Sequence, residues 1–118
     1  MWEVEFFEKD NGRCPAKEFL AELSPKKDLP YIYNSIKQLE EHGYHLKRPH
    51  VDFLKDDIWE LRIKTINGNF RFFYFFFDKG KIIITHGIKK KSGVVNPKEI
   101  EFAKECKVIY LDRKGRNR

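Results

Sequence analysis

The sequence has little of what a secreted or membrane-spanning protein needs. Only two cysteines, Cys14 and Cys106, occur among its 118 residues, which is too few for a scaffold held by disulfides. The amino terminus carries acids at Glu3 and Glu5 in place of the basic start and apolar block of a signal peptide. The longest strictly apolar run, residues 72–77, is far too short to cross a bilayer as a helix. We therefore expect a protein of the reducing cytoplasm.

Signatures of metal binding, nucleotide hydrolysis and nucleophilic catalysis are absent as well. The sequence holds no P-loop, GxGxxG or GxSxG motif, and neither cysteine has a histidine at an informative spacing. The histidines His42, His45 and His50 lie near Asp52, but they lack the HxxxH or paired-cysteine spacing of a zinc site. The sequence therefore predicts no metal and no other cofactor.

What the chain does have is positive charge and aromatic surface. Lysine and arginine number 24 against 18 aspartates and glutamates. The resulting net charge of +6 favours an anionic partner, nucleic acid or an acidic protein segment, if the cations cluster. The 11 phenylalanines, 5 tyrosines and 2 tryptophans supply large apolar side chains that a disordered chain lacks. With no polar linker and no internal repeat, residues 1–118 are expected to form one domain.

Hydrophobic periodicity and turn residues predict the order β-α-α-β-β-β-α. The expected strands cover residues 2–7, 58–66, 70–77 and 81–88, the expected helices cover residues 15–23, 26–42 and 97–110, and residues 44–56 are expected to form a loop. Asn67-Gly68 is a strong hairpin signal, and Lys79-Gly80 marks a second turn. The predicted class is α+β, with a small antiparallel sheet made of an N-terminal strand and a three-stranded meander. Two N-terminal helices and one C-terminal helix are expected to cover one face of the sheet and leave the other at least partly open.

Counting outward from the first hairpin assigns side chains to the two faces of the sheet. With Asn67-Gly68 as a two-residue loop, Lys64 lies opposite Arg71 and Arg62 lies opposite Phe73. The open face then carries the charged side chains Glu60, Arg62, Lys64 and Arg71, whereas Trp59, Leu61, Ile63, Phe72, Tyr74 and Phe76 face the core. Like charges opposite each other repel. The cluster therefore indicates either a bound phosphate, with Phe73 stacking on a base, or simply a solvated face.

The third meander strand adds a histidine and further cations. A two-residue loop at Lys79-Gly80 places His86 opposite Phe73 and brings Lys90 to the basic face, whereas a three-residue loop at residues 78–80 would turn His86 inward. The run Lys89-Lys90-Lys91 is either a contact for a polynucleotide backbone or a solvated charge run. On the open face, His86 would be the side chain best suited to proton transfer near neutral pH.

A succession of short motifs along the chain resembles a known family. The motifs are Ile58-Trp59-Glu60-Leu61-Arg62, Phe70-Arg71-Phe72-Phe73-Tyr74, Thr85-His86-Gly87-Ile88-Lys89-Lys90 and Pro97-Lys98-Glu99-Ile100. Together they resemble the RelE/ParE superfamily of toxin–antitoxin toxins, and above all its phage-derived, HigB-like branch. The resemblance extends over residues 15–110 and implies a RelE-like fold.

The same resemblance implies an activity and a partner. Such toxins are ribosome-dependent mRNA endonucleases, also called mRNA interferases, that need no metal. The ribose 2′-hydroxyl attacks the adjacent phosphate, and basic side chains assist. A type II antitoxin, here HigA-like with a helix-turn-helix DNA-binding fold, holds the toxin inactive, and the pair can form a higher-order assembly.

Site residues follow from the resemblance by position. Arg62 and Arg71 match family arginines that bind the phosphate and stabilise the transition state, and either Lys89 or Lys90 matches a basic position after the third strand. The full set of catalytic candidates is Arg62, Lys64, Arg71, His86 and Lys90, and the candidates for RNA or ribosome binding are Phe73, Lys89 and Lys91. The RelE branch of the family also uses a tyrosine in its C-terminal part. Residues 92–97 contain no tyrosine, which leaves that role vacant or filled by His86 or Lys64.

Two other functions are compatible with the same fold, because a fold does not decide a function. A ParE-like toxin would act by binding gyrase. A phage remnant would bind nucleic acid or a partner protein without catalysis. The density of cations on the predicted open face favours RNA over gyrase as the target.

Overall fold

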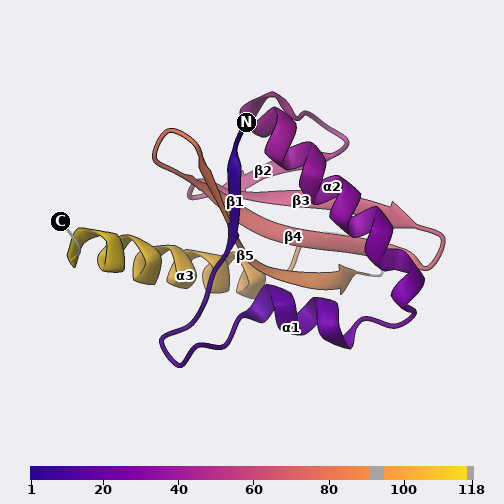
Figure 1. Cartoon of the computed structure of the whole chain (residues 1–118), viewed down its shortest axis with the longest axis horizontal. Helices are drawn as coiled ribbons and strands as arrows, with labels where there is room; N and C mark the ends of the chain where they lie inside the picture. Colours follow the sequence, from indigo (N-terminus) through magenta and orange to yellow (C-terminus); the bar gives the residue numbers. More distant parts are fainter. Residues whose placement is uncertain (91–94, 117–118) are drawn as a thin grey trace.

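A single mixed β-sheet carries the fold of this chain. The computed structural model describes residues 1–90 and 95–116. In this part of the chain five strands, β1 (Glu3–Phe6), β2 (Val51–Lys55), β3 (Ile58–Thr65), β4 (Gly68–Phe77) and β5 (Lys81–Lys90), lie in the order β1-β5-β4-β3-β2 (Figure 1). The helices are α1 (Pro15–Glu22), α2 (Leu29–His42) and α3 (Pro97–Arg116). The predicted α+β class is confirmed.

Two features of the sheet differ from the prediction. The N-terminal strand β1 runs parallel to β5, so the sheet is mixed and not purely antiparallel. The segment expected to be a loop contains the edge strand β2, which pairs antiparallel with β3. Strand β2 has only five residues and its register shifts between Phe53 and Lys55, so no regular alternation marks it in the sequence.

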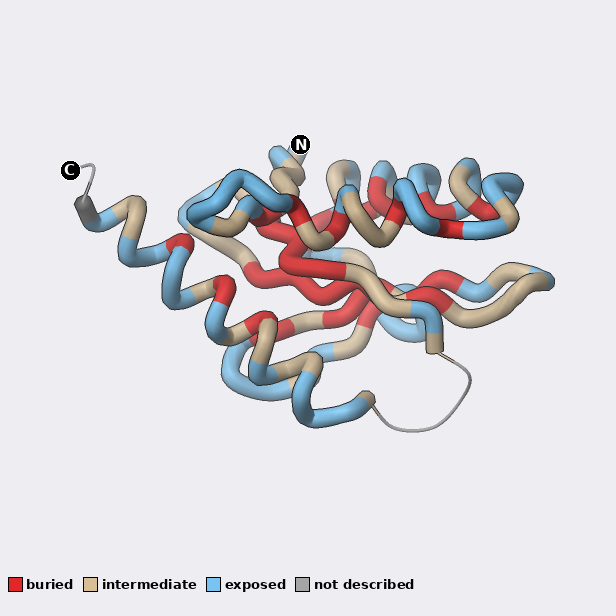
Figure 2. The backbone as a smooth tube through the Cα atoms, turned by 90° about the horizontal axis from the view of Figure 1, so that it is seen from below, coloured by how far each residue is buried: buried red, intermediate tan, exposed pale blue. Residues whose placement is uncertain are grey.

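Helices cover both faces of the sheet, although the sequence predicted them on one. Figure 2 shows α1 and α2 on one side and α3 on the other. The α1/α2 side buries the larger core, with Leu20, Ile32, Ile36 and Leu39 against Leu61, Ile63, Phe70, Phe72 and Tyr74. On the other side Ala103, Cys106 and Tyr110 of α3 pack against Ile58, Phe73, Phe75 and Ile83. Only the part of this second face that α3 leaves uncovered is open.

Local sequence explains where α2 begins and ends. The expected helix start at residue 26 is a short 3₁₀ turn, Lys26–Asp28, and α2 itself begins at Leu29 with Pro30 in its first turn. The helix ends at Gly43, where φ is +49° and a Cβ atom would lie only 1.9 Å from the indole nitrogen of Trp2.

In the described residues no helix has the length and apolar character needed to cross a bilayer.

The turn between β3 and β4 lies one residue earlier than predicted. Thr65 pairs with Gly68, so Ile66 and Asn67 form the two-residue loop. Thr65 Oγ1 accepts a hydrogen bond from the Asn67 backbone N–H at 3.1 Å, and the Asn67 side-chain amide donates to Asp28 Oδ1 at 3.0 Å. These bonds hold Asn67 inside the turn and explain the shift.

The shifted register changes the pairs but keeps the faces. Arg62, not Lys64, lies opposite Arg71, and Lys64 lies opposite Asn69. Because each strand partner moves by two residues, every side chain stays on its predicted face. Trp59, Leu61, Ile63, Phe72, Tyr74 and Phe76 therefore belong to the α1/α2 core, as predicted.

The turn between β4 and β5 has three residues, the alternative that would turn His86 inward. Phe77 pairs with Lys81, and Tyr74 with Ile84. The register then shifts, so that Phe73 pairs with His86 and Thr85 is the extra residue. This bulge cancels the effect of the longer loop and returns His86 to the same face as Phe73.

Candidate functional site

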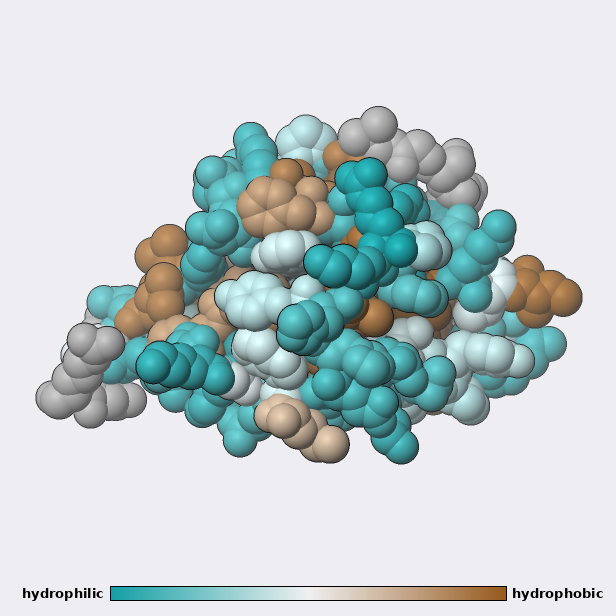
Figure 3. Space-filling model, turned by 90° about the horizontal axis from the view of Figure 1, so that it is seen from above, coloured by the Kyte–Doolittle hydropathy of each residue, from teal (hydrophilic) through white to brown (hydrophobic). Residues whose placement is uncertain are grey.

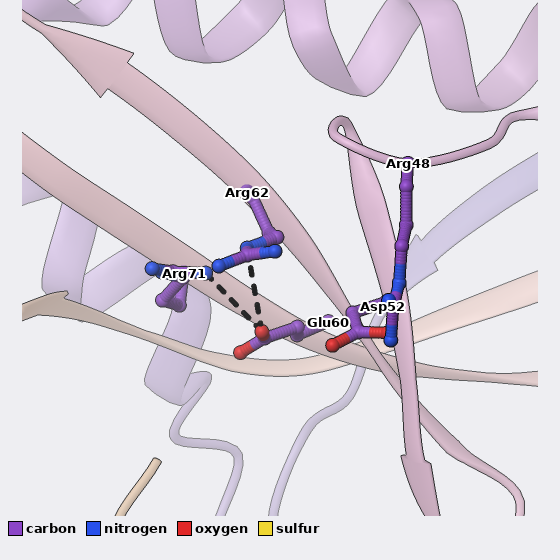
Figure 4. Close-up of polar contacts among 5 residues, drawn as sticks. All are labelled: Arg48, Asp52, Glu60, Arg62 and Arg71. Atoms are coloured by element: carbon purple, nitrogen blue, oxygen red, sulfur yellow. Dashed lines mark hydrogen bonds and ion pairs between the residues drawn. The ribbon is translucent and has the colours of Figure 1, made fainter. Parts of the chain in front are cut away.

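Two arginines on the face of β3 and β4 converge on one carboxylate. Arg71 Nη1 donates to Glu60 Oε1 at 3.2 Å, and Arg62 Nε lies 3.6 Å from the same oxygen (Figure 4). The side chain of Arg62 is 37% exposed, whereas those of Arg71 and Glu60 are 12% and 3% exposed. Arg62 therefore presents its guanidinium to solvent, and Arg71 lies behind it.

Glu60 is a buried charge whose partners do not fully satisfy it. Among the described residues its Oε2 atom has no hydrogen-bond partner, and neither does the buried Nε of Arg71. Burial raises the pKa of Glu60, and the positive charges of Arg71 and Arg62 oppose that shift. One carboxylate neutralises at most one of the two guanidinium charges, so the cluster has a net positive charge and unused hydrogen-bonding capacity.

The lysines divide between the two sides of the sheet. Lys90 lies opposite Asn69 on the face of Arg71, and its charge acts on Glu60. Lys89 points to the other face, with Nζ 5.8 Å from the centre of the Phe70 ring. Of the two candidates for the basic position after the third strand, Lys90 is therefore the one that shares a face with the arginines. Lys91 lies outside the described residues.

Two hollows meet at the arginine pair. The first, which we call the α2 hollow, has a volume of about 490 Å³ and is lined by Tyr31, Asn34, Ser35, Pro49, His50, Arg62, Ile63, Lys64, Asn69 and Arg71. The second, the α3 hollow, measures about 370 Å³ and is lined by Asp52, Phe53, Leu54, Lys55, Glu60, Arg62, Arg71, Val95 and Ile100. Figure 3 looks onto the β2 edge of the sheet, where most of the surface is hydrophilic. Arg62 and Arg71 line both hollows.

The prediction that Phe73 offers its ring to a base is wrong. The side chain is fully buried because α3 covers this part of the sheet. Its ring stacks on His86, with centroids 4.7 Å apart. Phe73 is a core residue.

His86 lies on the predicted face, but it is buried and turned to other partners. Its exposure is 7%, and it lies between Phe73 and the edge of the Phe102 ring. Nδ1 is 3.0 Å from the hydroxyl of Thr85, which donates to the Phe73 carbonyl, and Nε2 is 3.0 Å from Glu99 Oε1 in α3. His86 lines neither arginine hollow. The expectation of a solvent-facing proton-transfer residue beside the arginines is therefore wrong.

Burial of His86 is expected to make the stability of the fold depend on pH. Burial lowers the pKa of His86 below its ordinary value of 6.5, and the hydrogen bond and charge of Glu99 oppose this shift. Below pH 6.5 the unfolded chain therefore takes up a proton that the folded chain resists. We expect the melting temperature to fall on acidification from about pH 7.5 to about pH 5.5, and to fall less in His86→Gln.

The matched control for this measurement is His50→Gln, because His50 is exposed. Its melting temperature should follow that of the unmodified chain at each pH. Arg13 and Glu18 also line the hollow beside His86 and Glu99, so all melts should be repeated at high salt. Identical acid slopes in His86→Gln and the unmodified chain would show that this histidine does not cause the pH dependence.

Other groups considered from the sequence do not assemble into a site. Within residues 1–90 and 95–116, no three His, Cys, Asp or Glu side chains gather as metal ligands would. Cys106 is a buried residue of α3 that packs against the sheet, and this burial raises the pKa of its thiol to about 12. Asp52 accepts from Arg48, with Oδ1 2.6 Å from Nη2 (Figure 4).

Sequence reasoning missed the residues that α2 contributes to the α2 hollow. Tyr31 and Asn34 stand on the polar side of an amphipathic helix, where exposed side chains are ordinary. In the structure the Tyr31 side chain is 62% exposed although it is large and aromatic, and this exposure is what marks it as a candidate binding residue. No local pattern predicts that this part of α2 lies beside β3.

Comparison with known families matches most of the chain. Residues 18–107 match the model of a family described as phage derived protein Gp49-like (DUF891). The matched range extends from α1 into α3 and includes both arginines, Glu60 and the lysines of β3 and β5. No curated protein matches the chain.

Proposed function

The chain belongs to the Gp49-like family of phage-derived proteins, which falls within the RelE/ParE-like toxin superfamily, and on that premise we propose that it is the toxin of a type II toxin–antitoxin pair. Its activity is cleavage of mRNA on the translating ribosome, in the manner of the HigB-like branch. The single observation that carries the proposal is the pair Arg62 and Arg71, joined by the buried Glu60 and placed where two hollows meet.

The reaction needs positive charge more than any other property. The ribose 2′-oxygen forms a bond to the adjacent phosphorus while the bond from phosphorus to the 5′-oxygen breaks, which yields a cyclic 2′,3′-phosphate and a free 5′-hydroxyl. The 2′-hydroxyl gives up one proton and the leaving 5′-oxygen gains one. Negative charge grows on the non-bridging phosphate oxygens in the transition state, and fixed cations stabilise it there.

Each cation has a distinct part in this proposal. Arg62 is exposed and contacts the non-bridging oxygens directly, with Arg71 behind it as a second donor. Glu60 is a positioning residue, because its ion pairs hold both guanidinium groups at one point. Lys64 and Lys90 lie on the same face and are the remaining groups placed to bind the phosphate or exchange protons. His86 is buried under α3 and has no contact with substrate in this scheme.

The partners of the proposed toxin are RNA, which its charge favours, and an antitoxin, which its family implies. The chain carries a net charge of +6, which attracts ribosomal RNA and the messenger. A HigA-like antitoxin with a helix-turn-helix fold would hold it inactive in the cytoplasm, where ribosomes are.

The test is induced expression of the chain alone, followed by mapping of RNA 5′ ends. We expect growth to stop, with new 5′-hydroxyl ends inside translated regions and none in messages without a start codon. Co-expression of a cognate antitoxin should prevent both effects. Arrest with DNA damage and no new RNA ends would instead favour a ParE-like action on gyrase, and absence of any arrest would favour a non-catalytic binding protein.

A further inference from the structure

The strand β3 has an open edge beside the arginine pair. Strand β2 pairs with β3 only as far as the Val51–Leu61 pair, so residues 62–65 have no strand beyond them in the described part of the chain. The Arg62 backbone N–H, which points outward at this edge, donates to the His50 carbonyl at 2.8 Å. Outward-facing backbone groups recur at every second residue of a strand, so those of Lys64 also point outward at this edge.

On the α2 side, the hollow is lined by polar and aromatic side chains that form no hydrogen bond or ring contact with the rest of the described chain. The Tyr31 ring is 62% exposed and has no ring partner among the described residues. Asn34 and Ser35, one turn further along α2, have no side-chain hydrogen bond within the described chain, and neither has Asn69 on the β4 side. An amide side chain both donates and accepts, as the edge of a nucleobase requires.

The hollow is also continuous with the proposed phosphate site. Arg62, Lys64 and Arg71 line it from the sheet, and Tyr31 lines it from α2. A nucleotide with its phosphate on Arg62 would therefore have an exposed aromatic ring and free amides within the same cavity of about 490 Å³. The buried Phe73 cannot supply this ring, so the aromatic surface that an RNA site needs is available from α2 instead.

We propose that the α2 hollow is a nucleobase subsite, in which Tyr31 stacks on the base of the nucleotide adjoining the phosphate bound by Arg62 and Arg71. Asn34 and Asn69 hydrogen-bond the edge of that base and thereby select among bases. The inference rests on the proposed function, since it takes single-stranded RNA as the ligand. The inference adds Tyr31 of α2, a helix that contributes no residue to the cation cluster, to the residues that contact the substrate.

The test measures binding of a short single-stranded RNA whose 2′-oxygens are methylated, because such a strand lacks the nucleophile and cannot be cut. Fluorescence anisotropy compares it with the same strand carrying one abasic position. We expect Tyr31→Ala to weaken binding of the complete strand by about 5- to 150-fold, the range for loss of one aromatic stacking contact. The abasic strand should bind Tyr31→Ala and the unmodified chain equally.

Tyr33→Ala is the matched control. Tyr33 is on the same helix and 52% exposed, but it does not line the hollow, so its loss should leave both affinities unchanged. Equal affinities of Tyr31→Ala and Tyr33→Ala for the complete strand would overturn the inference. So would equal affinity of the unmodified chain for both strands, or no binding of either.

The outcomes for this subsite and for the proposed function are separable. If induced cells show cleaved messages while Tyr31→Ala binds RNA normally, the subsite is wrong and the nuclease stands. If Tyr31 proves necessary for base binding but no messages are cut, the subsite stands and the proposed reaction is wrong. If Tyr31→Ala loses its antitoxin and keeps RNA binding, the hollow serves a protein partner and the inference fails.

Discussion

Arg62→Ala is expected to abolish growth arrest while the chain remains folded. Arg62 is the more exposed of the two guanidinium groups, and in the proposed reaction it contacts the phosphate as negative charge develops. Loss of one donor to such a charge typically slows cleavage by about 10²- to 10³-fold. The ion pair with Glu60 is long, at 3.6 Å, and over a third of the Arg62 side chain is exposed, so the free energy of unfolding should change by no more than about 1 kcal/mol.

Arg48→Ala is the matched control, because it removes the same charge a short distance away. Arg48 is 76% exposed and paired with Asp52, and it lines neither hollow at the arginine pair. Arg48→Ala should still arrest growth. Both variants are compared by cell growth, by the abundance of new RNA 5′ ends and by thermal unfolding of the purified chain. If Arg62→Ala is still fully toxic, Arg62 is not part of the proposed site. If both variants lose toxicity to the same extent, the loss is caused by the lower net charge and not by the position of Arg62.

Arg71→Ala is expected to lose both activity and stability. Its side chain is 12% exposed and donates to a carboxylate that is almost fully buried. Removal of one partner from a buried ion pair typically costs about 3–5 kcal/mol, because the other charge is left without compensation. For a chain of 118 residues this is a large part of the total stability.

A double variant separates the two effects of Arg71. In Glu60→Gln/Arg71→Ala no buried carboxylate is left unpaired, so we expect most of the lost free energy of unfolding to return, as measured by urea denaturation. The double variant should nevertheless remain non-toxic, since a phosphate donor is missing. Growth arrest by this folded double variant would exclude Arg71 from the reaction. Full stability of Arg71→Ala by itself would show that the pair contributes little to the fold.

The arginine pair illustrates how a structural role and a functional role coincide in one group. Burial of Glu60 raises its pKa, which means that the folded chain bears a cost for keeping this carboxylate ionised. The ionised carboxylate in turn holds two flexible guanidinium groups at one point of the sheet before any substrate arrives. Preorganised charge of this kind stabilises a transition state without further rearrangement.

Register shows how far local sequence rules can lead. The hairpin signal at Asn67-Gly68 correctly predicted a two-residue loop, but Thr65 and Asp28 bind Asn67 and move the turn by one residue. Thr85 forms a bulge that no turn rule predicts, and it restores the face of His86 after a three-residue loop. In the β3–β4 hairpin the faces were predicted correctly and the strand partners were not, whereas in the β4–β5 hairpin the sequence left both the loop length and the face of His86 open.

By itself, the sequence determined the class of the fold, the location of the strands β3, β4 and β5, and the face that carries Glu60, Arg62, Lys64 and Arg71. These follow from alternation along a strand and from turn residues, which act over a few neighbouring positions. Only the tertiary structure decided which of these side chains reach solvent. Helix α3 buries Phe73 and His86, and α2 brings Tyr31 to the open edge of β3. Such contacts depend on how helices distant in sequence pack on the sheet, and no local pattern encodes them.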